Sequence, residues 1–154
     1  MGLIKKRFIG VGLFLALFGA EGASAERFGD YVGWRTCSEC HEEISDGWQT
    51  TPHASAFDSL KKQGSEKQSI PECVTCHVVA MDEDGGFIDS DLTPELINVQ
   101  CESCHGPGLS HTQSESPEDI VKTPDEHRCR TCHTEGQDKS FDYRDKSRFV
   151  HGGK

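Results

Sequence analysis

The sequence predicts a small, mainly α-helical domain with little regular β structure. Apolar residues recur at helical spacing in short segments, as with His53, Phe57 and Leu60. Threonine–proline pairs at 51–52 and 123–124 are typical of helix starts. One stretch, VVAMDEDGGFIDS, places apolar residues on both sides of a turn at residues 84–86, so one short β-hairpin is expected there.

The first 25 residues have the pattern of a secretory signal peptide. Basic residues at 5–7 precede an apolar run over 8–20, and Ala-Ser-Ala at 23–25 fits a cleavage site. An uncleaved membrane anchor is the alternative, but the apolar run is short of the roughly 20 residues that a bilayer core needs. We therefore expect residues 1–25 to be removed and residues 26–154 to form one domain, which is exported to the periplasm or beyond it.

The charge of the exported domain limits its partners. The full sequence has a formal net charge of −10, and loss of the signal segment, which carries Lys5, Lys6, Arg7 and Glu21, makes it more negative. A strongly negative protein is repelled by nucleic acids and by anionic membrane surfaces. We expect no nucleic-acid partner and no stable membrane insertion after cleavage, and a redox partner with a basic docking face is the better fit.

All eight cysteines fall in CxxC pairs, and a histidine follows each pair at once. Disulfides, zinc–thiolate sites and redox dithiols each explain the cysteine pairs, but none of them requires the histidines. A c-type haem explains both, because the two thiols bond to the porphyrin and the histidine ligates its iron. The sequence therefore predicts four covalently bound haem c groups, attached at Cys37, Cys40 and His41; Cys73, Cys76 and His77; Cys101, Cys104 and His105; and Cys129, Cys132 and His133.

Four haems change the kind of core that is expected. The exported part has 129 residues, which are too few to enclose four haems separately. The haems must then share walls and form the core together. The predicted class is a small multihaem cytochrome c, mainly α-helical.

Each haem iron has a second axial position, and the chain has four further histidines to fill it. Met81 is the only methionine left after signal cleavage, and we expect it to pack on apolar surface. The candidate distal ligands are His53, His111, His127 and His151. His53 lies on the apolar face of a predicted helix, and His151 ends an aromatic-rich tail. His111 follows a Gly-Pro-Gly turn that sends it towards a haem other than that of His105.

His127 is the ambiguous member of this set. It lies two residues before Cys129, and two helical steps turn its side chain about 200° away from that cysteine. It either reaches a neighbouring haem or lies on the surface. In the second case one haem iron is five-coordinate.

Four segments resemble the tetrahaem cytochrome c-554 family: YVGWRTCSECHEEISDGW, TTPHASAFDSLK, ECVTCHVVAMDEDGGF and, above all, VQCESCHGPG. The resemblance implies a mainly helical domain with haems in close pairs that carries electrons in the periplasm. It also implies that His53, His111 and His151 are distal ligands and that the haem of His77 lacks one. The chain departs from the family in being shorter after the fourth motif and in having His127.

Three functions follow as hypotheses. The first is electron transfer between redox partners through closely packed, mostly bis-histidine haems. The second is a redox enzyme that acts on nitric oxide, hydroxylamine or nitrite at an open haem iron. The third is a subunit of an extracellular conducting filament, in which a histidine such as His151 is donated across an interface.

Overall fold

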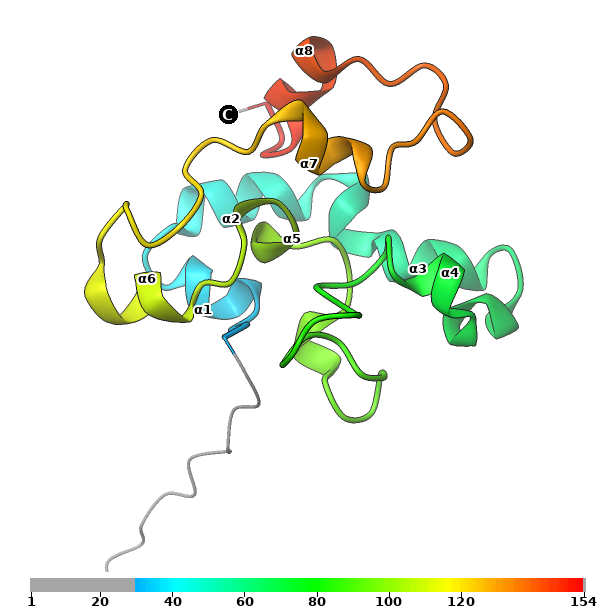
Figure 1. The fold of residues 1–154 in the computed structure, drawn as a ribbon, viewed down its shortest axis with the longest axis horizontal. Coiled ribbons are helices and arrows are strands. Elements are labelled where there is room, and N and C mark those ends of the chain that lie inside the picture. Colours follow the sequence, from blue (N-terminus) through cyan, green and yellow to red (C-terminus); the bar gives the residue numbers. More distant parts are fainter. Residues whose placement is uncertain (1–29, 154) are drawn as a thin grey trace, which may run out of the picture.

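The computed structural model describes residues 30–153, so the predicted signal peptide lies outside the described residues. The described chain consists of short helices joined by long loops (Figure 1). The α-helices are α1 (Trp34–Ser38), α2 (Glu42–Gln49), α3 (Ala56–Lys61), α4 (Pro71–Val74), α5 (Cys101–His105), α6 (Leu109–Ser114), α7 (Glu126–Arg130) and α8 (Tyr143–Lys146). The 3-10 helices are η1 (Pro52–Ser55), η2 (Ser65–Ser69), η3 (Pro94–Leu96) and η4 (Ser147–Phe149).

Local sequence explains where several of these helices begin and end. Proline occupies the first turn of η1 and α4, where its missing N–H costs no hydrogen bond. Gln100 and Ser103 form a capping box at the start of α5, and Gly106, with φ of 82°, ends that helix. The start predicted at residues 123–124 is wrong, because the Asp125 side chain caps α7 and the helix begins at Glu126.

The predicted β-hairpin is also wrong, and no strand occurs within residues 30–153. The turn does form, since the Phe87 N–H donates to the Val79 carbonyl at 2.9 Å. The Val79 N–H, however, donates to Leu96, and the only bridge in this part of the chain joins Val78 to Ile97. The two flanks therefore bond to different segments, and the ladder stops after one hydrogen bond.

Helices α1, α2 and α5 are held together near the centre of the fold. In Figure 1, α6 lies at one end of the ribbon, α3 and α4 lie at the other, and the α7–α8 segment passes over α2. Helix α1 contacts both α2 and α5. The Trp48 indole N–H in α2 donates to the Val99 carbonyl at 3.0 Å, which ties α2 to the residues just before α5.

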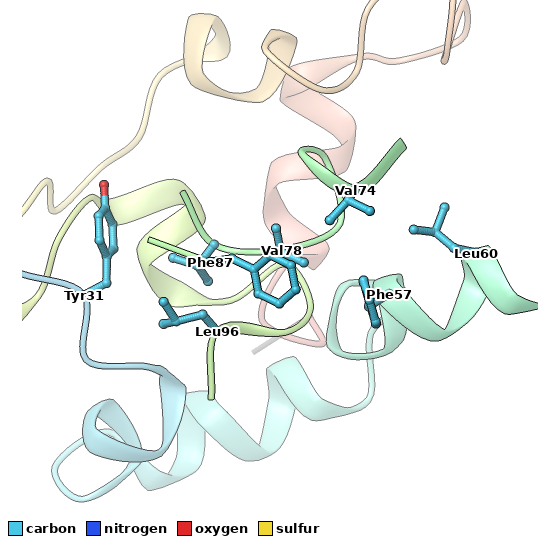
Figure 2. Packing of buried hydrophobic residues seen from close by; sticks show 8 residues of the cluster. Tyr31, Phe57, Leu60, Val74, Val78, Phe87 and Leu96 are labelled. Atoms are coloured by element: carbon cyan, nitrogen blue, oxygen red, sulfur yellow. The ribbon is translucent and has the colours of Figure 1, made fainter. Parts of the chain in front are cut away.

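The buried apolar residues gather around the second CxxCH motif rather than around all four. Figure 2 shows this cluster, whose members are Tyr31, Phe57, Leu60, Val74, Val78, Val79, Phe87 and Leu96. Met81 packs against it, as the sequence predicts. A cluster of this size is small for the length of the chain, which agrees with a core that side chains alone do not fill.

Within residues 30–153, none of the helices has the length and apolar character that crossing a membrane requires.

Candidate haem-binding site

Each CxxCH motif forms about one turn of helix, and the turn brings its histidine next to its cysteines. The His41 N–H donates to the Cys37 carbonyl at 2.9 Å, and the His133 N–H donates to the Cys129 carbonyl at 3.0 Å. The third motif is helix α5 itself. The sequence pattern and the local structure therefore agree that the sulfur atoms and the imidazole of one motif lie on one side.

Three proximal histidines each face one of the other histidines. The ring centres of His41 and His111 are 6.2 Å apart, with 15° between the ring planes. Those of His105 and His151 are 6.2 Å apart at 13°. The third pair, His53 and His133, is separated by 6.1 Å, and its planes differ by 60°.

These separations match those of two imidazoles on opposite sides of one metal ion. An imidazole nitrogen bonds a first-row metal at about 2.0 Å, and the ring centre lies about 1.1 Å behind the nitrogen. Two rings that share one ion across its axis therefore have centres about 6.2 Å apart. Direct ring stacking gives shorter distances, such as the 4.5 Å between His133 and Phe141. The histidine pairs thus fit an iron held between them.

The hydrogen bonds of the rings leave the correct nitrogen free. Nδ1 of His77 lies 2.6 Å from the Ala56 carbonyl oxygen, and Nδ1 of His105 lies 2.6 Å from that of Val121. Nδ1 of His111 lies 2.8 Å from the Ser116 carbonyl. A carbonyl oxygen only accepts hydrogen bonds, so each of these Nδ1 atoms carries the proton. Nε2 then keeps its lone pair for a metal, and the ring orientation is fixed.

The second motif differs from the other three. Within the described residues, His77 has no histidine ring at the separation seen in the three pairs. His127 lies on α7 with an exposed side chain, and no histidine ring faces it in the same part of the chain. The structure thus brings together three of the four spare histidines with proximal ones, and leaves His127 apart.

Contacts between cysteines show which motifs are neighbours. The Cys37 and Cys101 thiols are close to each other, and this proximity is the main cause that raises the pKa of Cys37 and lowers that of Cys101. Burial, helped by a contact with Cys132, raises the pKa of Cys76 to about 11. Partial burial, with the charge of the nearby Cys129 as a further cause, raises the pKa of Cys104 to about 11. The first motif therefore adjoins the third, the third adjoins the fourth, and the fourth adjoins the second.

A fully buried carboxylate joins the first and third motifs. Glu102, inside CESCH, is 0% exposed. Its oxygens accept hydrogen bonds from the N–H groups of Val32 at 3.0 Å, Gly33 at 2.8 Å and Gly108 at 2.7 Å. Gly33 is the residue before α1, and Gly108 is the residue before α6, which carries His111. The side chain thereby fixes the segment entering the first motif against the segment that leads to His111.

The neighbouring Gln100 strengthens the same junction. Its side-chain oxygen accepts from the Trp34 N–H at 2.7 Å, and its amide nitrogen donates to the carbonyls of Glu95 at 2.7 Å and Ile97 at 2.6 Å. No sequence pattern identified Glu102 or Gln100, because acidic and amide side chains are most often exposed. The one available signal was their position inside and next to CESCHGPG.

The fourth motif has a charged partner for its histidine. Nδ1 of His133 lies 3.0 Å from a carboxylate oxygen of Asp138. This hydrogen bond holds the pKa of Asp138 below its usual range. Phe141 stacks on the His133 ring, and the Arg130 guanidinium lies over the Phe141 ring, 4.9 Å from its centre. Sequence reasoning did not identify Asp138 or Phe141 either.

The arrangement does not suit zinc or disulfides. Within residues 30–153, no three side chains of histidine, cysteine, aspartate or glutamate gather in one place as a metal-binding cluster. No disulfide joins any two of the eight cysteines within residues 30–153. Two sites of four thiolates each would need such clusters. The paired thiols and the facing imidazoles fit the haem instead.

Comparison with known proteins gives the same answer. Residues 36–106 match the family model described as cytochrome c554 and c-prime. Cytochrome c-554 of Nitrosomonas europaea is 35% identical over 101 residues, a match that covers 57% of this chain and 43% of that protein. The chain thus spans less than half the length of this curated relative.

A solved structure extends the likeness to more of the chain. The reduced state of cytochrome c554 from Nitrosomonas europaea superposes with a TM-score of 0.50 at 28% identity, and covers 79% of this chain and 78% of that one. Both chains share the helical fold, and the likeness supports four covalently bound haem c groups as the cofactors of this chain. Over residues 36–106 in sequence, and in its helical fold, the chain is similar to cytochrome c-554.

Proposed function

We propose that this protein is an exported electron carrier, in which residues 26–154 hold four haems and residues 1–25 are a removed signal peptide. Three irons are held between histidine pairs: His41 with His111, His105 with His151, and His133 with His53. The observation that carries this proposal is the common ring separation of 6.1–6.2 Å in all three pairs.

The haem iron supplies reversible one-electron chemistry, and the chain supplies the ligands that keep it suited to this role. Two imidazoles on one iron leave no open position for a substrate. They also change little in geometry between oxidation states, because both rings are fixed by the fold before an electron arrives. Nδ1 hydrogen bonds to backbone carbonyls hold His105 and His111 in this way.

The order of the motifs supports passage of electrons through the domain. The cysteine contacts place the motifs in the order first, third, fourth, second. Haems attached to adjoining motifs share walls, and the domain is small enough that each lies close to the next. The first and second motifs are then the ends of the series. We propose that redox partners dock at these ends, in the periplasm, and that a basic partner surface complements the negative charge of the domain.

The experiment is a reductive titration of the purified full-length holoprotein, monitored by the haem absorbance. The expected result is an uptake of four electrons per chain, all of which are returned to a mild oxidant without loss of haem. Uptake of fewer than four electrons, or reduction that is not reversible, would contradict electron carriage by four haems. The same sample gives the haem content by pyridine haemochrome, which separates a loss of haem from a loss of function.

A second function has one observation in its favour. His77 has no facing histidine within residues 30–153, so its iron is the candidate five-coordinate site and a place for a small ligand such as nitric oxide. Nitric oxide added to the reduced protein is expected to alter the spectrum of one haem in four. If nitric oxide changes the spectrum of none of the four haems, this second function is excluded. The filament hypothesis loses its main reason, because His151 faces His105 of its own chain.

A further inference from the structure

The proximal histidines do not all have the same kind of hydrogen-bond partner. His77 and His105 donate from Nδ1 to neutral backbone carbonyls, those of Ala56 and Val121. His133 instead donates to the carboxylate of Asp138, at 3.0 Å. Among the proximal histidines with a hydrogen-bonded Nδ1, His133 is therefore the one with an anionic partner in the described part of the chain.

The carboxylate is held in place by several contacts. The Asp138 N–H donates to the Thr134 carbonyl at 2.8 Å, which closes the loop after the fourth motif. Its second oxygen accepts from the Ser140 hydroxyl at 3.2 Å. Phe141 covers one face of the His133 ring at 4.5 Å, so the ring cannot turn away. Both oxygens of Asp138 are thus engaged, one of them with the imidazole.

An anionic acceptor on Nδ1 has a defined effect on a metal-bound imidazole. It draws the Nδ1 proton towards itself, makes the ring a stronger electron donor at Nε2, and so stabilises the oxidised metal over the reduced one. The negative charge itself acts in the same direction. Asp138 is about one third exposed, so solvent weakens the charge effect but does not remove the hydrogen bond.

Other charged groups near His133 do not cancel this effect. Arg130 is a cation beside this motif, but its guanidinium donates to the carbonyls of His133 at 3.3 Å and Phe141 at 3.1 Å, not to the ring. It also bonds Glu126 at 3.3 Å, which offsets part of its charge. His53, on the other side of the pair, adds no positive charge as a ligand, because an imidazole that binds iron through one ring nitrogen is neutral.

We propose that Asp138 is a positioning residue that lowers the reduction potential of the haem ligated by His133, and sets it below the potentials of the other bis-histidine haems. This inference rests on the proposed ligand pairs. It deepens the proposed function, because the fourth motif lies inside the series, and a low-potential haem there makes the electron step onto it uphill from its neighbours.

The haem of His133 can be recognised by its own spectrum. The planes of its two axial rings differ by 60°, whereas those of the other pairs differ by 15° and 13°. The angle between axial imidazoles sets the splitting of the iron d orbitals. The tilted pair therefore gives a low-spin ferric electron paramagnetic resonance (EPR) signal apart from those of the near-parallel pairs.

The test is an EPR-monitored redox titration of the full-length holoprotein and three variants. Asp138→Asn keeps the size and an acceptor oxygen but removes the charge, and Asp138→Glu keeps the charge. Glu135→Gln is the matched control, because it removes the same charge from an exposed residue three positions away.

In Asp138→Asn we expect the tilted-pair signal to disappear on reduction at a higher potential, by about a tenfold change in the oxidised-to-reduced ratio, or about 59 mV for one electron. The other haems and the Glu135→Gln control keep their potentials. An unchanged potential of the tilted-pair haem in Asp138→Asn would overturn the proposal.

The remaining outcomes also decide. If the tilted-pair signal is absent from Asp138→Asn, the proposal requires that Asp138→Glu show both this signal and the low potential of the unaltered protein. A normal signal with a raised potential in Asp138→Glu would overturn the role of the charge. Absence of a tilted-pair signal in the unaltered protein would instead contradict the proposed ligand pair of His53 and His133, and so the proposed function rather than the role of Asp138.

Discussion

Truncation of Glu102 gives the most direct stability prediction from this structure. Its side chain is fully buried and accepts from the N–H groups of Val32, Gly33 and Gly108. In Glu102→Ala these three donors lose their partner inside the protein. Each buried group left unpaired costs about 1–3 kcal/mol, and water that enters the vacated space recovers part of this. We expect a loss of about 3–5 kcal/mol in the free energy of unfolding.

Glu102→Gln separates the hydrogen bonds from the volume of the side chain. The amide oxygen can still accept from Val32 and Gly108, but the amide NH₂ then faces the Gly33 N–H, and two donors oppose each other. The expected loss is smaller, about 1–3 kcal/mol. Glu118→Ala is the control, because Glu118 is an exposed acidic residue on the loop after α6 and such substitutions change stability by about 0.5 kcal/mol or less.

The assay is guanidinium chloride unfolding of the holoproteins, followed by far-ultraviolet circular dichroism. In the same unfolding series, the low-spin haem signal of the His41 and His111 pair should weaken first. Glu102 fixes the segment before α1 to the start of α6, and that link is lost. If Glu102→Ala unfolds within 0.5 kcal/mol of Glu118→Ala, a threshold set by the usual scatter of surface substitutions, the claim that this carboxylate joins the two motifs is wrong.

Further predictions concern the histidines and the C-terminal tail. In Gly152→Ala the new Cβ would lie 2.5 Å from a carbonyl oxygen of α2, at a φ of +71°. His151 should therefore leave its iron, and resonance Raman spectra should show one new high-spin haem. Gly136→Ala, whose Cβ meets nothing closer than 3.8 Å, should show no such change. His53→Ala should convert one low-spin ferric haem to high spin, because it removes one ring of a facing pair. His127→Ala should leave every haem spectrum unchanged, because the side chain is exposed on α7, and any loss of a low-spin signal would show that His127 is a ligand.

The helical class and the haem motifs were predictable because they depend on short-range patterns. One turn of helix joins two cysteines and a histidine wherever CxxCH occurs, and proline marks the first turn of η1 and α4. The hairpin was not predictable in the same way. Its turn was identified correctly, but the partner of Val79 is Leu96, which lies beyond the hairpin. Apolar flanks alone do not say which segment a strand will bond.

The site was predictable to the level of residue type but not of pairing. The supply of spare histidines indicated bis-histidine ligation, and the spacing of His127 from Cys129 left it ambiguous. Which histidine faces which depends on how distant segments return, as when the tail brings His151 to His105. Glu102 and Asp138 were missed because an acidic residue is exposed by default. Glu102 acquires its role because the fold brings Val32 and Gly33 next to it. Asp138 acquires its role because the loop after His133 folds back onto the His133 ring.

The central claim is that four haems are attached and that three of them have two histidine ligands while the haem of His77 has one. Low-temperature EPR of the oxidised full-length protein, with spins quantified against the haem content from pyridine haemochrome, tests it most directly. The account predicts four haems per chain, with three low-spin ferric signals, one of them from a tilted ring pair, and one high-spin signal. Four low-spin haems would show that a side chain fills the position opposite His77, and fewer than three would contradict the histidine pairs on which the account rests.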